Sequence, residues 1–417
     1  MSIPSRLSAD QSDRPGEGPP PKRPRLVGVD AARGIALIGM MAVHIFSLYD
    51  EQTDSVSWLA AVFHGRASAL FAVMAGVGLA LVSGGVHRHT GAQASAGRRG
   101  IAARAAVIAV VGLTLGLFWV DVAIILVCYS LLFVLALPFI TMGIRQLAVF
   151  TAAWTLLSPA IAYLVRPVLY EAPFMAVIDT DPNWTNLADP VALLSSLFFT
   201  GPYPVFQWLS YLLLGLLLGR LALDSVRVQL WLTAGGAAAV AAAQLTSTFL
   251  LNGLGGGSAL LATGEVDSWD LAEWDNRLLL DVSEVDQTTS GWWLAVGAPH
   301  SGTTLDLLNT MGSAAMVLGL CLLLARVAGR GMLALAGPGG MTLTLYSAHV
   351  LVMSFVYTTE IEVGENLLFW GQVLIFTAIG IAYRVSARRG PLELLAFTAS
   401  KAGRGPVSLH SPSTGSP

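Results

Sequence analysis

The sequence predicts an all-α integral membrane protein, a bundle of about ten transmembrane helices with both termini in the cytoplasm. Its 417 residues are 54% hydrophobic and only 12% charged, whereas soluble domains carry about 25% charged residues, and the mean hydropathy is +0.67. Stretches of about 20 apolar residues are long enough to cross a hydrocarbon layer of about 30 Å as helices. Such stretches run approximately over residues 30–50, 62–83, 103–120, 122–141, 146–165, 202–222, 228–250, 305–326, 332–357 and 366–385.

The basic residues between these stretches predict the orientation. With the N-terminus inside, 20 of the 23 Lys and Arg fall on the cytoplasmic side, and only Arg66, Arg166 and Arg277 fall outside. Because basic loops are retained in the cytoplasm, this split favours an even number of spans. The net charge of −3 is then the sum of two opposite faces and does not indicate a nucleic-acid partner.

The chain divides into one membrane domain and two tails. Residues 1–24 are rich in Pro and charge, and residues 399–417 end in LHSPSTGSP, so both are predicted to be disordered cytoplasmic tails. Residues 25–398 form the membrane domain, with external loops at about 166–201 and 251–304. No signal peptide is expected ahead of the first stretch. Cys128 and Cys321 lie within apolar stretches as buried core residues, and we expect neither a metal centre nor a tightly bound cofactor.

The first apolar stretch holds the most informative pair, Arg33 and His44, in RGIALIGMMAVH. Eleven helical steps of 100° leave only about 20° of offset, so both side chains project from one face about 16 Å apart, together with Asp30 and Met40. Such residues are costly on a lipid-facing surface, and this face is therefore predicted to look into the protein or to line a wet cavity. The alternative for Arg33 is a local ion pair with Asp30 at i, i+3 that only orients the helix.

The second stretch opens with HGRASALFAVMAG, which places His64 and Arg66 on the external side near His44. The two residues are candidates for stabilising an oxyanion or gating the outer mouth. An interfacial Arg66 that extends its side chain toward the headgroups is the alternative.

The external loops are acidic and aromatic. The run VALLSSLFF is too short to cross, so it is predicted to be re-entrant or interfacial. Trp269, Trp274, Trp292 and Trp293 fit an interfacial belt or, alternatively, a sugar-stacking surface, and His300 lies at the external mouth of the eighth stretch. The acids of the second loop are Glu265, Asp267, Asp270, Glu273, Asp275, Asp281, Glu284 and Asp286.

In the ninth stretch, Pro338 is predicted to break the start of the helix. Beyond it Thr342, Tyr346 and His349 recur on one side, which fits either packing between helices through shared hydrogen bonds or lining of the cavity. After the tenth stretch, RRGPLELLAFTAS is predicted to be a short amphipathic helix on the inner membrane surface.

Four of these motifs together resemble a known superfamily. RLVGVDAARGIALIGMMAVHIF is similar to the first-helix signature of the transmembrane acyltransferases, which include the heparan-alpha-glucosaminide N-acetyltransferases and bacterial membrane O-acyltransferases with an Arg, ten residues, His pattern. That pattern falls on Arg33 and His44. HGRASALFAVMAG, MTLTLYSAHVL and RRGPLELL look more like the YeiB-type bacterial branch. The heparan-type enzymes commonly place the catalytic His in the external turn after the first helix. Here that turn, YDEQTDSVSW, has none, so His44 and His64 both stay candidates.

The resemblance implies transfer of an acyl group, with acetyl as first choice, from cytoplasmic acyl-CoA as co-substrate to a hydroxyl or amine of an extracytoplasmic or lipid-linked glycan, in the plasma membrane. His44 would be the general base or a transient acyl carrier, and Arg33 would hold phosphate or the pantetheine amides of the donor. The remaining candidates for binding donor or acceptor are Asp30, Arg66, His300, Tyr346 and His349.

Two other classes stay open from sequence. In a transporter or flippase, His44 and His349 would serve substrate or proton movement, although no inverted repeat and no mid-span Asp or Glu supports it. A non-catalytic membrane protein is the third reading. The sequence leaves a homodimer open.

Overall fold

The computed structural model describes residues 26–50, 55–171, 181–264, 278, 280, 282 and 285–405. These residues form a helical bundle with one small hairpin, β1 (Tyr49–Asp50) and β2 (Ser55–Val56), in which Tyr49 pairs with Val56. The predicted tail 1–24 lies outside the described residues, and the last described helix ends at Arg404, beyond the expected limit at residue 398.

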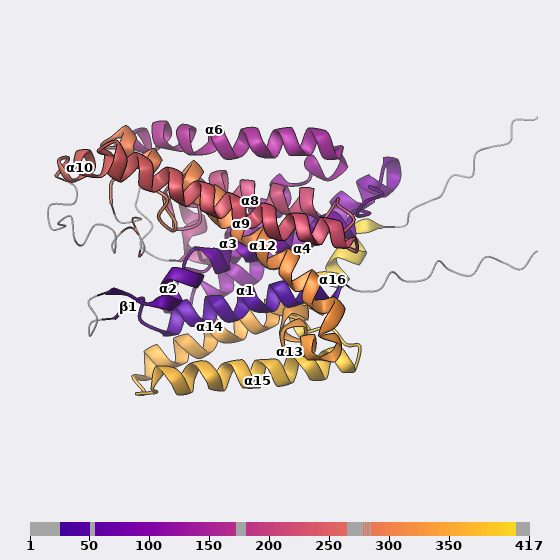
Figure 1. Cartoon of the computed structure of the whole chain (residues 1–417). Helices are drawn as coiled ribbons and strands as arrows, with labels where there is room; N and C mark the ends of the chain where they lie inside the picture. Colours follow the sequence, from indigo (N-terminus) through magenta and orange to yellow (C-terminus); the bar gives the residue numbers. More distant parts are fainter. Residues whose placement is uncertain are drawn as a thin grey trace, which may run out of the picture.

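The helices follow the predicted apolar stretches in order (Figure 1). The first half holds α1 (Val27–Ile45), α2 (Trp58–Phe63), α3 (Arg66–Val82), α4 (Gly91–Leu115), α5 (Leu126–Leu135), α6 (Ile144–Tyr170), α7 (Pro190–Ser195) and α8 (Val205–Leu218). The second half holds α9 (Val226–Thr248), α10 (Gly256–Leu261), α12 (Thr304–Val327), α13 (Leu333–Ala336), α14 (Thr342–Thr359), α15 (Glu365–Val385) and α16 (Pro391–Arg404).

The expectation of ten spans is not reproduced. Six of the described helical segments are long and apolar enough to cross a membrane, or seven if the bent pair Pro190–Thr200 and Val205–Leu218 counts as one span. The other predicted spans have physical interruptions. The α4 helix carries Arg98, Arg99 and Arg104, α5 has only ten residues, and Pro338 separates α14 from the helical turns before it.

The helices sort into an inner and an outer group. In α1, α2–α3 and α12, 61–72% of the residues in the most apolar stretch of the helix are buried. In α6, the α9 segment and α15 the buried share is only 22–28%. Small residues allow the inner contacts, since Gly76 of α3 meets the backbone of α8 at Gly215, and Gly236 of α9 meets α12 at Gly312. The bundle therefore centres on α1, α3 and α12, and the outer helices present apolar side chains to the surroundings.

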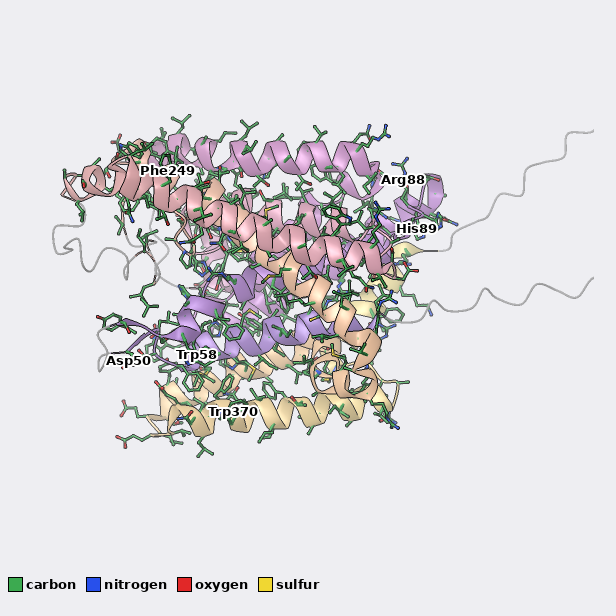
Figure 2. All side chains as sticks on the ribbon, viewed as in Figure 1. Asp50, Trp58, Arg88, His89, Phe249 and Trp370 are labelled. Atoms are coloured by element: carbon green, nitrogen blue, oxygen red, sulfur yellow. The ribbon has the colours of Figure 1, made fainter. Side chains whose placement is uncertain are left out.

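The two ends of the bundle differ in chemistry. We call one the arginine end, because Arg88, Arg98, Arg99, Arg220 and Arg326 all bond to loop or helix-terminal backbone there. Figure 2 labels Arg88 and His89 at this end, and Asp50 and Trp58 at the opposite end, which we call the histidine end. At the arginine end, residues of α1 and of α16 line one cavity.

Within the predicted loop 251–304, the described part forms its own small core. Trp293 is 1% exposed and packs with Leu251, Leu260 and Val282. The interfacial reading is therefore wrong for Trp293, because its ring closes the interior of this loop. Trp269, Trp274 and the acids from Glu265 to Glu284 lie outside the described residues, while Asp286 caps a turn through Thr288. Cys128 and Cys321 are buried as predicted.

Candidate functional site

The arginine end of α1 is fixed by a buried carboxylate. Asp30 is 2% exposed, and its two oxygens face Arg33 at 3.5 Å and Arg384 of α15 at 2.8 Å. Arg33 also donates to the carbonyl of Met74 on α3 at 3.2 Å. The predicted i, i+3 pair is confirmed, and it holds the Arg33 guanidinium between α1 and α3.

A cavity of about 330 Å³ opens beside this pair, within the size range of small-molecule sites. Residues of α1, α3, α4, α5, α14 and α16 line it, and Leu126 and Tyr129 of α5 form part of its apolar wall. Gly339 and Gly340 bring the start of α14 to the wall. A side chain at position 339 would collide with the backbone carbonyl of Asp30, so only glycine allows this approach.

The charged groups of the cavity leave a positive surplus. Arg33, Arg104 and Arg389 face two acids, Asp30 and Glu393. Asp30 is paired with Arg33 and Arg384. The Glu393 carboxylate accepts from the backbone N–H groups of Leu343 and Thr344 and from the Thr344 hydroxyl, at 2.6–3.2 Å, so it caps the N-terminus of α14.

Among the described residues, no carboxylate lies within ion-pair distance of the two other arginines. Arg104 lies 6.0 Å from the ring centre of Phe133, and its buried Nε has no hydrogen-bond partner among the described residues. The Arg389 guanidinium lies 3.8 Å over the ring of Phe397. Aromatic faces position both cations without neutralising them, and the cavity therefore suits an anionic ligand with an apolar arm.

His44 lies at the other end of the α1 face and contacts His349 of α14. The Nδ1 atom of His44 is 3.1 Å from Nε2 of His349. The ring planes differ by 14°, with centroids 5.3 Å apart, which fits two nearly coplanar rings meeting edge to edge through one N–H···N hydrogen bond, as in-plane donors require. His44 is partly buried and His349 fully buried.

His349 continues the chain of contacts to α15. Its Nδ1 lies 2.9 Å from Oε1 of Gln372, which is 6% exposed. Neither His349 nor Tyr346, which is 2% exposed, lines the cavity, and both belong to the buried core. Gln372 is not among the candidate residues that the sequence indicates. Its only signal is a polar residue between Phe369 and Phe376 on the buried side of an otherwise apolar helix.

His64 belongs to a second histidine contact. Gly65, with φ of +68°, ends α2 and turns the chain into α3, which leaves His64 at the break. The ring of His64 meets His300 edge-on at 5.1 Å, and His300 in turn meets Tyr203. His300 itself adopts φ of +60°, a costly region for a side chain of this size.

The two histidine contacts involve different pairs of rings. His64 is near enough to interact electrostatically with His44, yet each ring packs on a different histidine. Arg66 donates to the carbonyl of Ala61 at 2.6 Å, so it stabilises the α2–α3 turn and lies outside the cavity. Among the described residues, no group of three or more His, Cys, Asp or Glu could hold a metal ion.

Helices of this length and apolarity make the chain a multi-pass membrane protein. It belongs to the family described as heparan-alpha-glucosaminide N-acetyltransferase, catalytic, whose match covers residues 25–249, more than half of the 417 residues. A comparison with curated proteins found no match.

The family match includes Arg33, His44, His64 and Arg104. His349 of α14, Gln372 of α15 and Arg389 of the loop before α16 lie beyond it.

Proposed function

We propose that this protein is a membrane acyltransferase that takes an acetyl group from acetyl-CoA at the arginine end and passes it to a hydroxyl or amine at the histidine end. The observation that carries the proposal is the cavity beside Arg33, because its surplus of positive charge and its apolar wall match the two parts of an acyl-CoA. Phosphates would bind Arg33, Arg104 and Arg389, and the pantetheine arm would lie along the apolar wall toward Leu126 and Tyr129.

The apolar wall leads toward the histidine end. On α14, Thr342 lines the cavity and His349 lies two turns further on, opposite His44. A thioester at the tip of the pantetheine arm would thus approach His44 from the arginine end of the bundle. The free Nε2 edge of His44, which does not take part in the contact with His349, is the edge available to a reacting acceptor.

In this mechanism His44 acts as the general base. Its Nε2 accepts the proton of the acceptor N–H or O–H while the acceptor heteroatom bonds to the thioester carbonyl carbon. The C–S bond then breaks, and the CoA thiolate receives the proton held by His44. No other co-reactant is needed, since a thioester is already an activated acyl donor.

The acceptor class follows from the family and from the predicted orientation. If the histidine end faces the outside, the acceptor is an extracytoplasmic or lipid-linked glycan, and an amino sugar is the first probe to try. A transporter remains the competing class, and turnover of donor separates the two.

The test uses the purified full-length protein with acetyl-CoA, glucosamine as acceptor, and release of the free CoA thiol as the signal. We expect turnover in the wild-type protein, and a loss of roughly 10²–10⁴-fold in His44→Ala with donor affinity retained, the usual contribution of a positioned base. His44→Gln should be nearly as inactive, because an amide cannot take the proton.

Two controls sharpen this test. His87 is exposed in the loop after α3, so His87→Ala should keep full activity. If His44→Ala stays active while His64→Ala is dead, the base belongs to the His64–His300 contact. Wild-type protein that neither binds nor turns over acetyl-CoA contradicts the proposal and favours transport.

A further inference from the structure

The geometry points to Gln372 and His349 as positioning residues that set which nitrogen of His44 carries the proton, so that His44 presents an unprotonated Nε2 to the acceptor. This inference rests on the proposed function and names two residues outside the family match. The contacts that carry it are the 3.1 Å link from His44 to His349 and the 2.9 Å link from His349 to Gln372.

The direction of the hydrogen bonds follows from the amide oxygen. An oxygen only accepts, so His349 Nδ1 must carry the proton that points to Gln372 Oε1. In neutral His349 the Nε2 atom is then unprotonated and accepts from Nδ1–H of His44. One proton on Nδ1 of a neutral His44 leaves its Nε2 with a free lone pair, which is the state a general base needs.

The reverse amide orientation gives the opposite result. If the Gln372 nitrogen faced His349, the protons would shift along the chain, and Nε2 of His44 would carry a hydrogen instead of a lone pair. A single amide therefore selects between a competent and an incompetent tautomer, 23 residues from His349 and on a different helix.

The burial of Gln372 supports a role other than packing. Its Nε2 is buried and has no hydrogen-bond partner among the described residues, a costly state for an amide N–H₂. A leucine at this position would fill the space between Phe369 and Phe376 without that cost. What only the amide supplies is an uncharged acceptor for His349.

Among the described residues, Gln372 is the acceptor that contacts His349 Nδ1. His64 interacts electrostatically with His44, and Tyr346 lies one turn before His349 on α14. Among the described residues, no carboxylate is hydrogen-bonded or ion-paired to either ring of the pair. When His44 takes the acceptor proton, its Nδ1–H keeps donating to His349, which stabilises the imidazolium.

The test compares Gln372→Leu with Gln372→Glu in the full-length protein, using acetyl-CoA, glucosamine and the free thiol signal across pH. Gln372→Leu should lower kcat by about tenfold, the equivalent of one lost hydrogen bond, with little change in KM for acetyl-CoA. Gln372→Glu keeps an acceptor facing His349, so its kcat at high pH should stay within a few-fold of wild type. Its added negative charge favours the protonated ring, so the acid limb of its pH–rate profile should move to higher pH.

Phe376→Leu is the matched control, because it perturbs packing one turn further along the same buried side of α15. Its pH–rate profile should equal that of the wild type. Gln372 variants that keep the wild-type kcat and pH profile, or that lose activity together with Phe376→Leu, overturn this inference while leaving the proposed function standing if His44→Ala is inactive. Wild-type protein without acetyl-CoA turnover overturns both.

Discussion

The carboxylate of Asp30 lies 2.8 Å from Nη1 of Arg384, although 354 residues separate the two along the chain. The same arginine nitrogen donates to the carbonyl of Ala336 at 3.0 Å. This contact ties the first helix to the outer helix α15 and to the turn before α14. It also occupies one oxygen of Asp30, so the other is left to hold Arg33 at the wall of the cavity.

Arg33 is expected to bind the donor as a planar fork. Arg33→Ala should weaken acetyl-CoA affinity by about tenfold to a hundredfold, the equivalent of one or two charge-assisted hydrogen bonds. Arg33→Lys should restore little, since a point charge replaces a bidentate group and no longer reaches both Asp30 and a phosphate. The measurement is titration of the purified protein with acetyl-CoA.

Arg66→Ala is the control for this prediction, because Arg66 bonds to Ala61 outside the cavity and its loss should leave donor affinity unchanged. Wild-type affinity in Arg33→Ala would reduce Arg33 to a residue that orients α1.

The fold class was predictable because lipid imposes a simple code of apolar length. A helix lies on every predicted stretch, and the break at Pro338 is present. The number of spans was not predictable in this way, since helices shielded by neighbours need not be long or uniformly apolar. The α4 helix keeps Arg104 because α16 packs along it and the cavity receives the side chain. The predicted surface helix α16 thus also forms part of the cavity wall.

The candidate site was predictable only where its residues lie on one helix. Periodicity placed Asp30, Arg33 and His44 on one face of α1. Asp30 and Arg33 line the cavity, whereas His44 is absent from its lining and contacts His349 instead. His349, the partner of His44, lies on α14 about 300 residues later, and helical periodicity says nothing about which helices meet. Gln372 carries no motif, and only its contact with His349 reveals it.

Membrane orientation remains a prediction that reporter fusions can check. The bonds of Arg99 to α16, of Arg220 to the loop after α3, and of Arg326 to Asp224 gather the loops on one side of the bundle. The positive-inside rule predicts that this side faces the cytoplasm. Fusions near residues 95, 224 and 395 should report a cytoplasmic location, and fusions near 180 and 275 an external one. A cytoplasmic signal near 275 would reverse the proposed donor and acceptor sides.

Asp181, which lies between α6 and α7 outside the candidate spans, should make stability depend on pH. Its Oδ1 accepts from the backbone N–H of Ile124 at 2.7 Å, which opposes but does not cancel the effect of burial, and burial raises the pKa of Asp181 to about 6. Because an unfolded Asp titrates near about 3.9, the folded chain binds more protons between these values. The free energy of unfolding therefore falls as pH rises from about 4 through 6, and levels off above that.

Asp181→Asn keeps an oxygen for Ile124 and removes the charge, so it should raise the thermal midpoint in detergent more at pH 7.5 than at pH 4.5, where the folded carboxyl is already mostly protonated. The expected gain in the free energy of unfolding at pH 7.5 is about 1–2 kcal/mol. This is less than the full pKa shift would give, because the side chain is only partly buried. Asp224 is exposed, and Asp224→Asn should change neither midpoint. An Asp181→Asn variant that is destabilised equally at both pH values would show that Asp181 acts through the geometry of its hydrogen bond, and that its burial does not penalise the charge.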